Sequence, residues 1–271
     1  MSVTRRLLMK EFSFRRQWPA YGLALLILLV PIAYGVSNTG NKAFPSNLGV
    51  YGQLMITPFI VIIPIGAVLL GCLPTFDAVG HRFIANTRSR IDIRALVGVK
   101  LIASAVIPFV AFTLLAFASF IIAFYIWPTL GNPGVLPNLY GLTEANVLEH
   151  ELTDASYSSL LSLGQLPYGL IYSFWFGLGA ATYSCLGVAA LLVLNNRMLA
   201  LATPFVIYFV ETILANLTVG TKGALMYSLV PFGLNQSPIL IAAAPQLLLV
   251  VGTIACWTVL FPKLPYMERT A

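Results

Sequence analysis

The sequence predicts an all-α polytopic membrane protein with six transmembrane helices and an N-terminal interfacial helix. The composition is 59% hydrophobic and the mean hydropathy is +0.88, whereas soluble domains contain about 45–50% apolar residues. Long apolar runs recur along the chain, and each is close to the roughly 20 residues that a helix needs to cross a bilayer. The basic residues fall almost entirely between alternate runs. These three observations define the fold class.

Each apolar run fits one membrane-spanning helix within a single transmembrane domain over residues 1–271. A membrane β-barrel would instead show alternating segments of about ten residues. Proline lies inside several runs, which a bilayer helix tolerates because neighbouring helices satisfy the freed carbonyl groups. The expected spans are residues 18–36, 53–76, 101–127, 166–194, 198–217 and 239–261.

Positive charge gathers on one side of this topology. An even number of spans places both termini on the same side as the loops that follow the second and fourth spans. All but two of the 15 basic residues lie there, the exceptions being Lys42 and Lys222. The positive-inside rule therefore predicts both termini in the cytoplasm. We expect the chain to lie in the plasma or inner membrane. The net charge of +6 is explained by membrane topology and lipid contact, and no nucleic-acid partner is expected.

Residues 1–17 precede the first span. Leu7, Leu8 and Phe12 fall near one face of a helix and most of the basic residues fall elsewhere, a pattern typical of an interfacial helix. A short anchoring tail is the equal alternative. No small-residue cleavage site follows the first apolar run, so a cleaved signal peptide is not expected.

Two segments are expected on the extracytoplasmic side. The loop at 128–165 contains four of the nine acidic residues and has the helix-forming character of one or two short amphipathic helices. It is interpreted as a solvated cap, with a surface for substrate exit or partner docking as the alternative. Between the fifth and sixth spans, "ALMYSLVPFGL" is too short to cross and too apolar for water. We expect it to dip into the outer leaflet.

The sequence offers no catalytic site. His81 and His150 fall on opposite faces of the membrane and cannot share a site, and no H-E-x-x-H or G-x-S-x-G motif is present. Cys72, Cys185 and Cys256 are widely separated within predicted spans and do not form a metal-binding pattern. The chain also lacks a phosphate-binding loop. We expect neither an enzyme nor a metal site, and any ATP that drives this protein must bind to another chain.

Several residues within the spans are candidates for function or packing. Glu211 lies inside the fifth span, where a carboxylate is a candidate for substrate or proton handling, or for structural pairing with Lys222. Tyr172 and Trp175 belong to an aromatic stretch that forms either an interfacial belt or the lining for an amphipathic substrate. A stripe of small residues at four-residue intervals favours close helix packing in the fourth span. This stripe consists of Gly177, Ala181, Cys185 and Ala189.

The basic loop at 77–100 is longer than a chain reversal requires. Its stretch "RFIANTRSRIDIRALVGVK" interleaves arginines with apolar residues such as Phe83, Ile84 and Ile91. This pattern is typical of a short amphipathic helix that enters a groove on a cytoplasmic partner. The alternative is a topology determinant that touches anionic lipid headgroups.

This loop and the expected topology resemble the permease subunits of ABC-2-type transporters, also classed as type V exporters. Members commonly carry an acidic residue and a glycine at the start of the loop, then a Ser-Arg pair, and then Gly-x-Lys where the third span begins. A proline often precedes the Ser-Arg pair, whereas Thr87-Arg88 stands there in this chain. The matching residues are Asp77, Gly80, Ser89, Arg90, Gly98 and Lys100.

The resemblance implies an assembly. Two permease subunits, identical or different, would form the membrane core, and a separate ABC ATP-binding subunit would carry ATP and Mg, with no cofactor on this chain. Phe83 and Ile84 would be apolar anchors in the coupling loop. The residues expected to couple to the ATPase are Asp77, Gly80, Phe83, Ile84, Arg88, Ser89, Arg90, Asp92 and Lys100.

The implied function is ATP-driven export of a peptide, an antibiotic, a lipid-like molecule or another small substrate. Two other classes stay open. One is a secondary transporter or channel in which Glu211 carries protons or ions, although no inverted repeat is present to favour it. The other is a membrane scaffold or sensor whose basic loop recruits a signalling partner.

Overall fold

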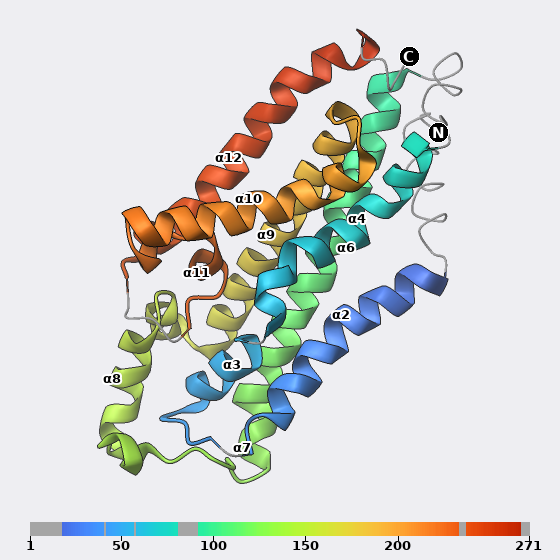
Figure 1. Ribbon diagram of the computed structural model, residues 1–271. Coiled ribbons are helices and arrows are strands. Elements are labelled where there is room, and N and C mark those ends of the chain that lie inside the picture. The colour runs from blue at the N-terminus through green and yellow to red at the C-terminus, as the bar shows by residue number, and fades with distance from the viewer. Residues whose placement is uncertain (1–17, 41, 57, 81–91, 233–236, 267–271) are drawn as a thin grey trace.

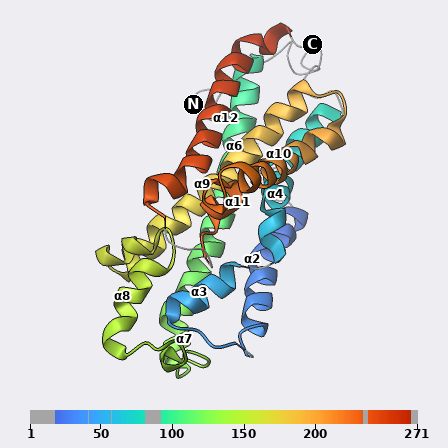
Figure 2. The ribbon, with the colours of Figure 1, turned by 60° about the vertical axis from the view of Figure 1, so that its left-hand side comes forward.

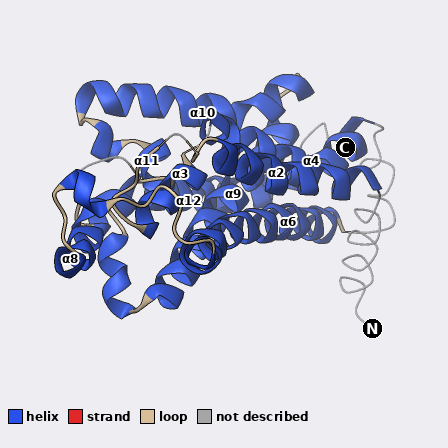
Figure 3. Cartoon of the chain, turned by 90° about the horizontal axis from the view of Figure 1, so that it is seen from below, coloured by secondary structure: helices blue, strands red, loops and turns tan. Residues whose placement is uncertain are grey.

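The computed structural model describes residues 18–40, 42–56, 58–80, 92–232 and 237–266 (Figure 1). Within these ranges the chain is helical and forms no strand, which confirms the predicted all-α class (Figure 3). The predicted interfacial helix at 1–17 lies outside the described residues. The long helices are α2 (Trp18–Ser37), α4 (Ile63–Gly80), α6 (Ile93–Ile121), α9 (Gln165–Val193), α10 (Arg197–Thr218) and α12 (Ile239–Lys263). The short ones are α3 (Asn47–Met55), α7 (Trp127–Thr129), α8 (Glu144–Asp154) and α11 (Leu225–Leu229).

Four stretches of helix are long and apolar enough to cross a membrane, and the chain is therefore a multi-pass helical membrane protein. These stretches are Ile93–Thr129, Gln165–Val193, Arg197–Thr218 and Ile239–Tyr266. The helices α2 and α4 contribute shorter apolar segments, Gly22–Ser37 and Ile63–Val79.

Two predicted boundaries differ from the structure. The apolar run at 53–76 is interrupted, because α3 ends at Met55 and the chain continues as a 3-10 turn, Pro58–Ile62, before α4 begins. Pro58 lacks an amide hydrogen and disfavours helix in the residue before it, which explains the break. The third helix begins at Ile93 rather than at 101, because the Asp92 carboxylate accepts a hydrogen bond from the Arg94 amide and caps the helix. The connection between α4 and α6 is correspondingly shorter than the predicted 77–100 loop.

The helix α9 lies in the middle of the bundle, in contact with α4, α6, α10 and α12 (Figures 1 and 2). Small residues allow this close packing. A Cβ atom on Gly177 would collide with Thr113 Oγ1 and would lie 2.7 Å from the Phe109 carbonyl oxygen, both on α6. On α4, a Cβ atom on Gly71 would lie 2.5 Å from the Ser104 carbonyl oxygen. Glycine at these positions sets how near α4 and α6 approach each other and α9.

The bundle has two chemically different ends. The start of α6, the turn between α9 and α10 and the last turn of α12 lie together, and they carry the described cations Arg94, Arg197 and Lys263 (Figure 1). We call this the basic end. The helices α3, α7 and α8 lie at the opposite end, which we call the cap end (Figure 1). A smaller core cluster around Leu96, Leu191 and Trp257 lies near the basic end, and a larger aromatic cluster fills the rest of the bundle.

The glycine contact between α6 and α9 predicts a specific loss of stability. We expect Gly177→Ala to destabilise the fold by about 1–3 kcal/mol, the usual cost of forcing extra atoms into a packed core. Thermal unfolding in detergent would measure the effect. Gly252→Ala is the matched control, because a Cβ atom there would meet no atom within 4 Å. An equal midpoint for both variants would contradict this account of the packing.

Candidate functional site

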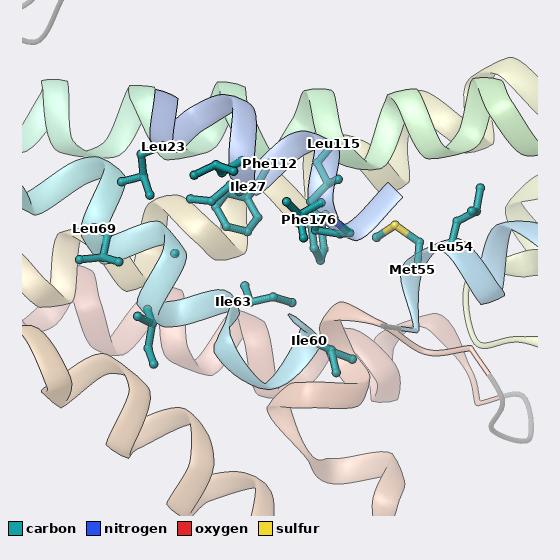
Figure 4. A pocket seen from close by; sticks show the side chains of 15 residues that line it. Leu23, Ile27, Leu54, Met55, Ile60, Ile63, Leu69, Phe112, Leu115 and Phe176 are labelled. Carbon is teal, nitrogen blue, oxygen red and sulfur yellow. The ribbon is translucent and has the colours of Figure 1, made fainter. Parts of the chain in front are cut away.

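An apolar cavity of about 360 Å³ lies between α2, α4, α6 and α9, with α3 and the 3-10 turn Pro58–Ile62 at one end (Figure 4). All its lining residues are apolar, including Ile27, Met55, Phe112 and Phe176. Leu26, which also lines it, is 59% exposed, so the cavity reaches the outer surface of α2. Such a cavity accommodates hydrocarbon groups and offers no polar side chain to hold a charged one.

The apolar segment that we expected to enter the outer leaflet, between α10 and α12, contains the short helix α11. The first residue of α11 donates a hydrogen bond to a carboxylate. Glu211 Oε2 accepts a hydrogen bond of 2.8 Å from the Leu225 amide. Among the described residues, Glu211 makes no ion pair with Lys222, the partner that we expected for a structural role. The carboxylate instead satisfies one of the amides that the start of a helix leaves without an internal partner.

Aromatic side chains hold the other end of α11. Tyr172 Oη donates a hydrogen bond of 2.6 Å to the Leu229 carbonyl. Trp175 Nε1 and Tyr157 Oη donate to the Ser228 carbonyl at 2.9 and 3.1 Å. Burial raises the pKa of Tyr157 to about 12, so its hydroxyl keeps its proton to a higher pH than that of an exposed tyrosine. These bonds satisfy carbonyl groups that water would otherwise solvate.

The structure thus brings Glu211 of the predicted fifth span together with Tyr172 and Trp175 of the aromatic stretch in the predicted fourth span. All three bind the backbone of α11, and Tyr172 is only 1% exposed. Tyr157 completes this set and was not predicted from the sequence. The apolar segment between the fifth and sixth predicted spans did indicate that such a residue must exist, because its backbone groups need hydrogen-bond partners from elsewhere in the chain.

At the basic end, side chains tie helix starts to helix ends. The Arg94 guanidinium donates to the Pro262 carbonyl at 3.5 Å, which links the start of α6 to the end of α12. The Arg197 guanidinium lies 5.1 Å from the centre of the Phe76 ring, which links the start of α10 to the end of α4. These contacts join the four helix ends around the connection between α4 and α6.

The predicted coupling residues fall into three groups in the structure. Asp77 and Asp92 are exposed at the end of α4 and the start of α6, and Gly80 is the last residue of α4. Lys100 is 4% exposed within α6, so its side chain is buried among the helices instead of lying on the surface. The remaining candidates, Phe83, Ile84, Arg88, Ser89 and Arg90, lie outside the described residues.

The small-residue stripe of α9 has mixed surroundings. Gly177 meets α6, and Ala181 and Ala189 are buried. Cys185 is only partly buried, and its carbonyl accepts a hydrogen bond of 3.2 Å from Trp257 Nε1 on α12. The stripe therefore contributes to contacts with more than one neighbouring helix.

The predicted amphipathic helix of the 128–165 loop is α8, at the cap end. Its Glu151 is buried and Glu151 Oε1 accepts a hydrogen bond of 3.4 Å from the Leu48 amide, near the start of α3. Burial raises the pKa of Asp154, an effect that His150 partly opposes. Among the described residues, no three His, Cys, Asp or Glu side chains are grouped so as to hold a metal ion.

Comparison with known proteins adds no relative, because no family model, curated protein or solved structure matches the chain.

The aromatic contacts of α11 predict the effect of removing one hydroxyl. We expect Tyr172→Phe to lower the free energy of unfolding by about 1–3 kcal/mol, because the buried Leu229 carbonyl loses its donor. Thermal unfolding of the purified protein in detergent would measure this loss. Tyr125→Phe is the matched control, since Tyr125 is 41% exposed. If the two variants unfold at the same temperature, the hydroxyl of Tyr172 does not stabilise α11.

The raised pKa of Asp154 predicts that this residue makes the stability of the fold depend on pH. Its folded-state pKa is raised, so the protonated form is favoured by folding, and this stability is lost as pH rises through the folded-state pKa. We expect Asp154→Asn to raise the unfolding temperature at neutral pH and to lose this advantage well below the ordinary aspartate pKa of about 3.9. The exposed Glu149→Gln on the same helix is the control. An Asn variant that gains equally at both pH values would exclude this cause.

Proposed function

We propose that this chain is the membrane-spanning subunit of an ATP-driven exporter of the ABC-2 type, energised by a separate ATP-binding subunit. The observation that carries the proposal is the arginine-rich connection between α4 and α6, which joins two helix ends at the basic end of the bundle. The ABC-2 permeases that the sequence resembles carry their coupling loop at the same place in the chain.

In the proposed topology, α2 and α4 are the first and second of six spans. The 3-10 turn Pro58–Ile62 precedes α4 and extends its apolar stretch toward the cap end. The basic end then faces the cytoplasm with both termini, in agreement with the positive-inside rule. The cap end, with the acidic helix α8, faces outward.

The helix ends around the connection suit mechanical coupling. Asp92 caps α6, and Arg94 and Arg197 link α6 to α12 and α10 to α4. A displacement of the connection would therefore be transmitted to α4, α6, α10 and α12. Because α4 and α6 pack against α9, it would also affect this central helix. Asp77 lies exposed in the last turn of α4, where the helix dipole disfavours a carboxylate. Contact with a cationic partner residue would offset that cost.

The proposed cycle assigns ATP chemistry to the partner. Two permease subunits would form the membrane core, and the partner subunits would bind ATP and Mg and close on each other. Their movement would displace the connection between α4 and α6 and shift the helices around the substrate. The apolar cavity of Figure 4 supports a substrate with a hydrocarbon portion, such as an apolar peptide, an antibiotic or a lipid-like molecule.

Affinity purification in mild detergent tests the proposal. We expect a chain with a phosphate-loop motif to co-purify, and we expect Arg90→Glu to reduce its recovery by about tenfold or more, because opposed like charges cost several kcal/mol at an interface. Lys263→Glu is the matched control, since Lys263 is exposed at the same end but outside the connection.

Two outcomes would reject the proposal. One is recovery of the protein alone with transport intact, which would favour a secondary transporter that uses Glu211. The other is a stable complex that ATP does not alter, which would favour a scaffold or sensor.

A further inference from the structure

A second hollow, a groove of about 400 Å³, lies between α10, α11 and α12 and is lined by different residues from the cavity of Figure 4. Its walls include Ile207 of α10, Leu225 of α11 and Leu248 of α12. Glu211 is the exception among its lining residues, because every other one is apolar. The groove therefore combines a hydrocarbon surface with a single negative charge.

Only one of the two carboxylate oxygens of Glu211 accepts a hydrogen bond within the described residues. Oε2 accepts the hydrogen bond from the Leu225 amide, which fixes the orientation of the group. In the part of the chain that the structure describes, Oε1 has no hydrogen-bond partner and no cation lies within ion-pair distance. A charge is costly at this position in a membrane helix unless something compensates it.

The backbone adds a second acceptor. Pro245 and Ile241 both line the groove on α12, and Pro245 has no amide hydrogen to donate to the Ile241 carbonyl four residues earlier. The neighbouring amides are already used, since Gly223 donates to the Gly220 carbonyl and Leu225 to Glu211. The groove thus favours a ligand that brings its own N–H donors.

The groove runs along α10 and α12 from beyond the C-terminal end of α10. Glu211 lies about two turns, roughly 10 Å, before the end of α10 at Thr218. Val219 and Gly223 line the groove beyond that end, while Ile207 and Leu248 line it farther along the helices. An amphiphile could place its polar group beside Glu211 with its apolar body against the helices.

We propose that this groove binds a lipophilic primary ammonium ion. The protonated nitrogen would donate to Glu211 Oε1 and to the Ile241 carbonyl, and the hydrocarbon portion would lie against Ile207, Leu225 and Leu248. A carboxylate or phosphate headgroup would be repelled by Glu211, and a neutral alcohol would gain no charge-assisted hydrogen bond. This binding needs only the present chain, so it does not depend on the proposed ATPase partner.

Photolabelling of the purified full chain in phosphatidylcholine nanodiscs at neutral pH tests the proposal. The probe is a benzophenone that carries a primary alkylamine, and labelled peptides are mapped by mass spectrometry. We expect label on α10 and α12, and we expect dodecylamine to compete at about tenfold lower concentration than dodecanol, the advantage of a charge-assisted hydrogen bond. Dodecanoate should compete more weakly than dodecanol.

Glu211→Gln separates charge from structure, because glutamine keeps an acceptor for the Leu225 amide. We expect this variant to lose the tenfold preference for dodecylamine, while the control Glu149→Gln, exposed on α8, keeps it. Ala244→Phe places a larger side chain in the groove. We expect this variant to reduce the labelling of α10 and α12 that dodecylamine competes away. The proposal is overturned if Glu211→Gln retains the preference, or if the label maps to the cavity between α2 and α6.

Discussion

Backbone groups that are removed from water must find hydrogen-bond partners inside the protein, and the arrangement around α11 depends on this constraint. The helix has five residues, so most of its amides and carbonyls have no partner within it. Glu211 accepts from its first amide, and Tyr172 and Trp175 donate to its last carbonyls. The same requirement explains why Tyr208 Oη donates to the Ile60 carbonyl at 3.0 Å, within the 3-10 turn before α4.

These hydrogen bonds also link parts of the chain that would otherwise be independent. The donors to α11 come from α9 and from Tyr157 just before it, while the acceptor for its first amide comes from α10. Because α9 is also held closely against α6 through Gly177, the short helix is connected to the centre of the bundle. A displacement of α9 or α10 would therefore alter the walls of the groove beside Glu211.

The two hollows have different chemistry because of the residues around them. The cavity between α2 and α6 is lined by apolar residues alone, and it suits a hydrocarbon group. The groove beside α10 contains a carboxylate and a carbonyl without its helical donor, and it suits a cation with an apolar body. Both lie away from the basic end, where Arg94 and Arg197 tie helix ends together. In the proposed exporter, ligand contact and ATP-driven movement would therefore involve different parts of the same helices.

The helical membrane class follows from the apolar runs alone, because runs of membrane-spanning length have few other stable structures in a bilayer. The sequence also located α9, α10 and α12 within a few residues, since charged or polar residues end those runs. The environment of individual side chains depends on how the helices pack, as the burial of Lys100 and the hydrogen bond between Glu211 and the Leu225 amide show. The burial of Lys100 and the hydrogen-bond partner of Glu211 could not be predicted from the composition and spacing of a single segment. The partner of a polar group in the membrane is chosen by which distant segments pack beside it, and that choice exists only after the helices have assembled.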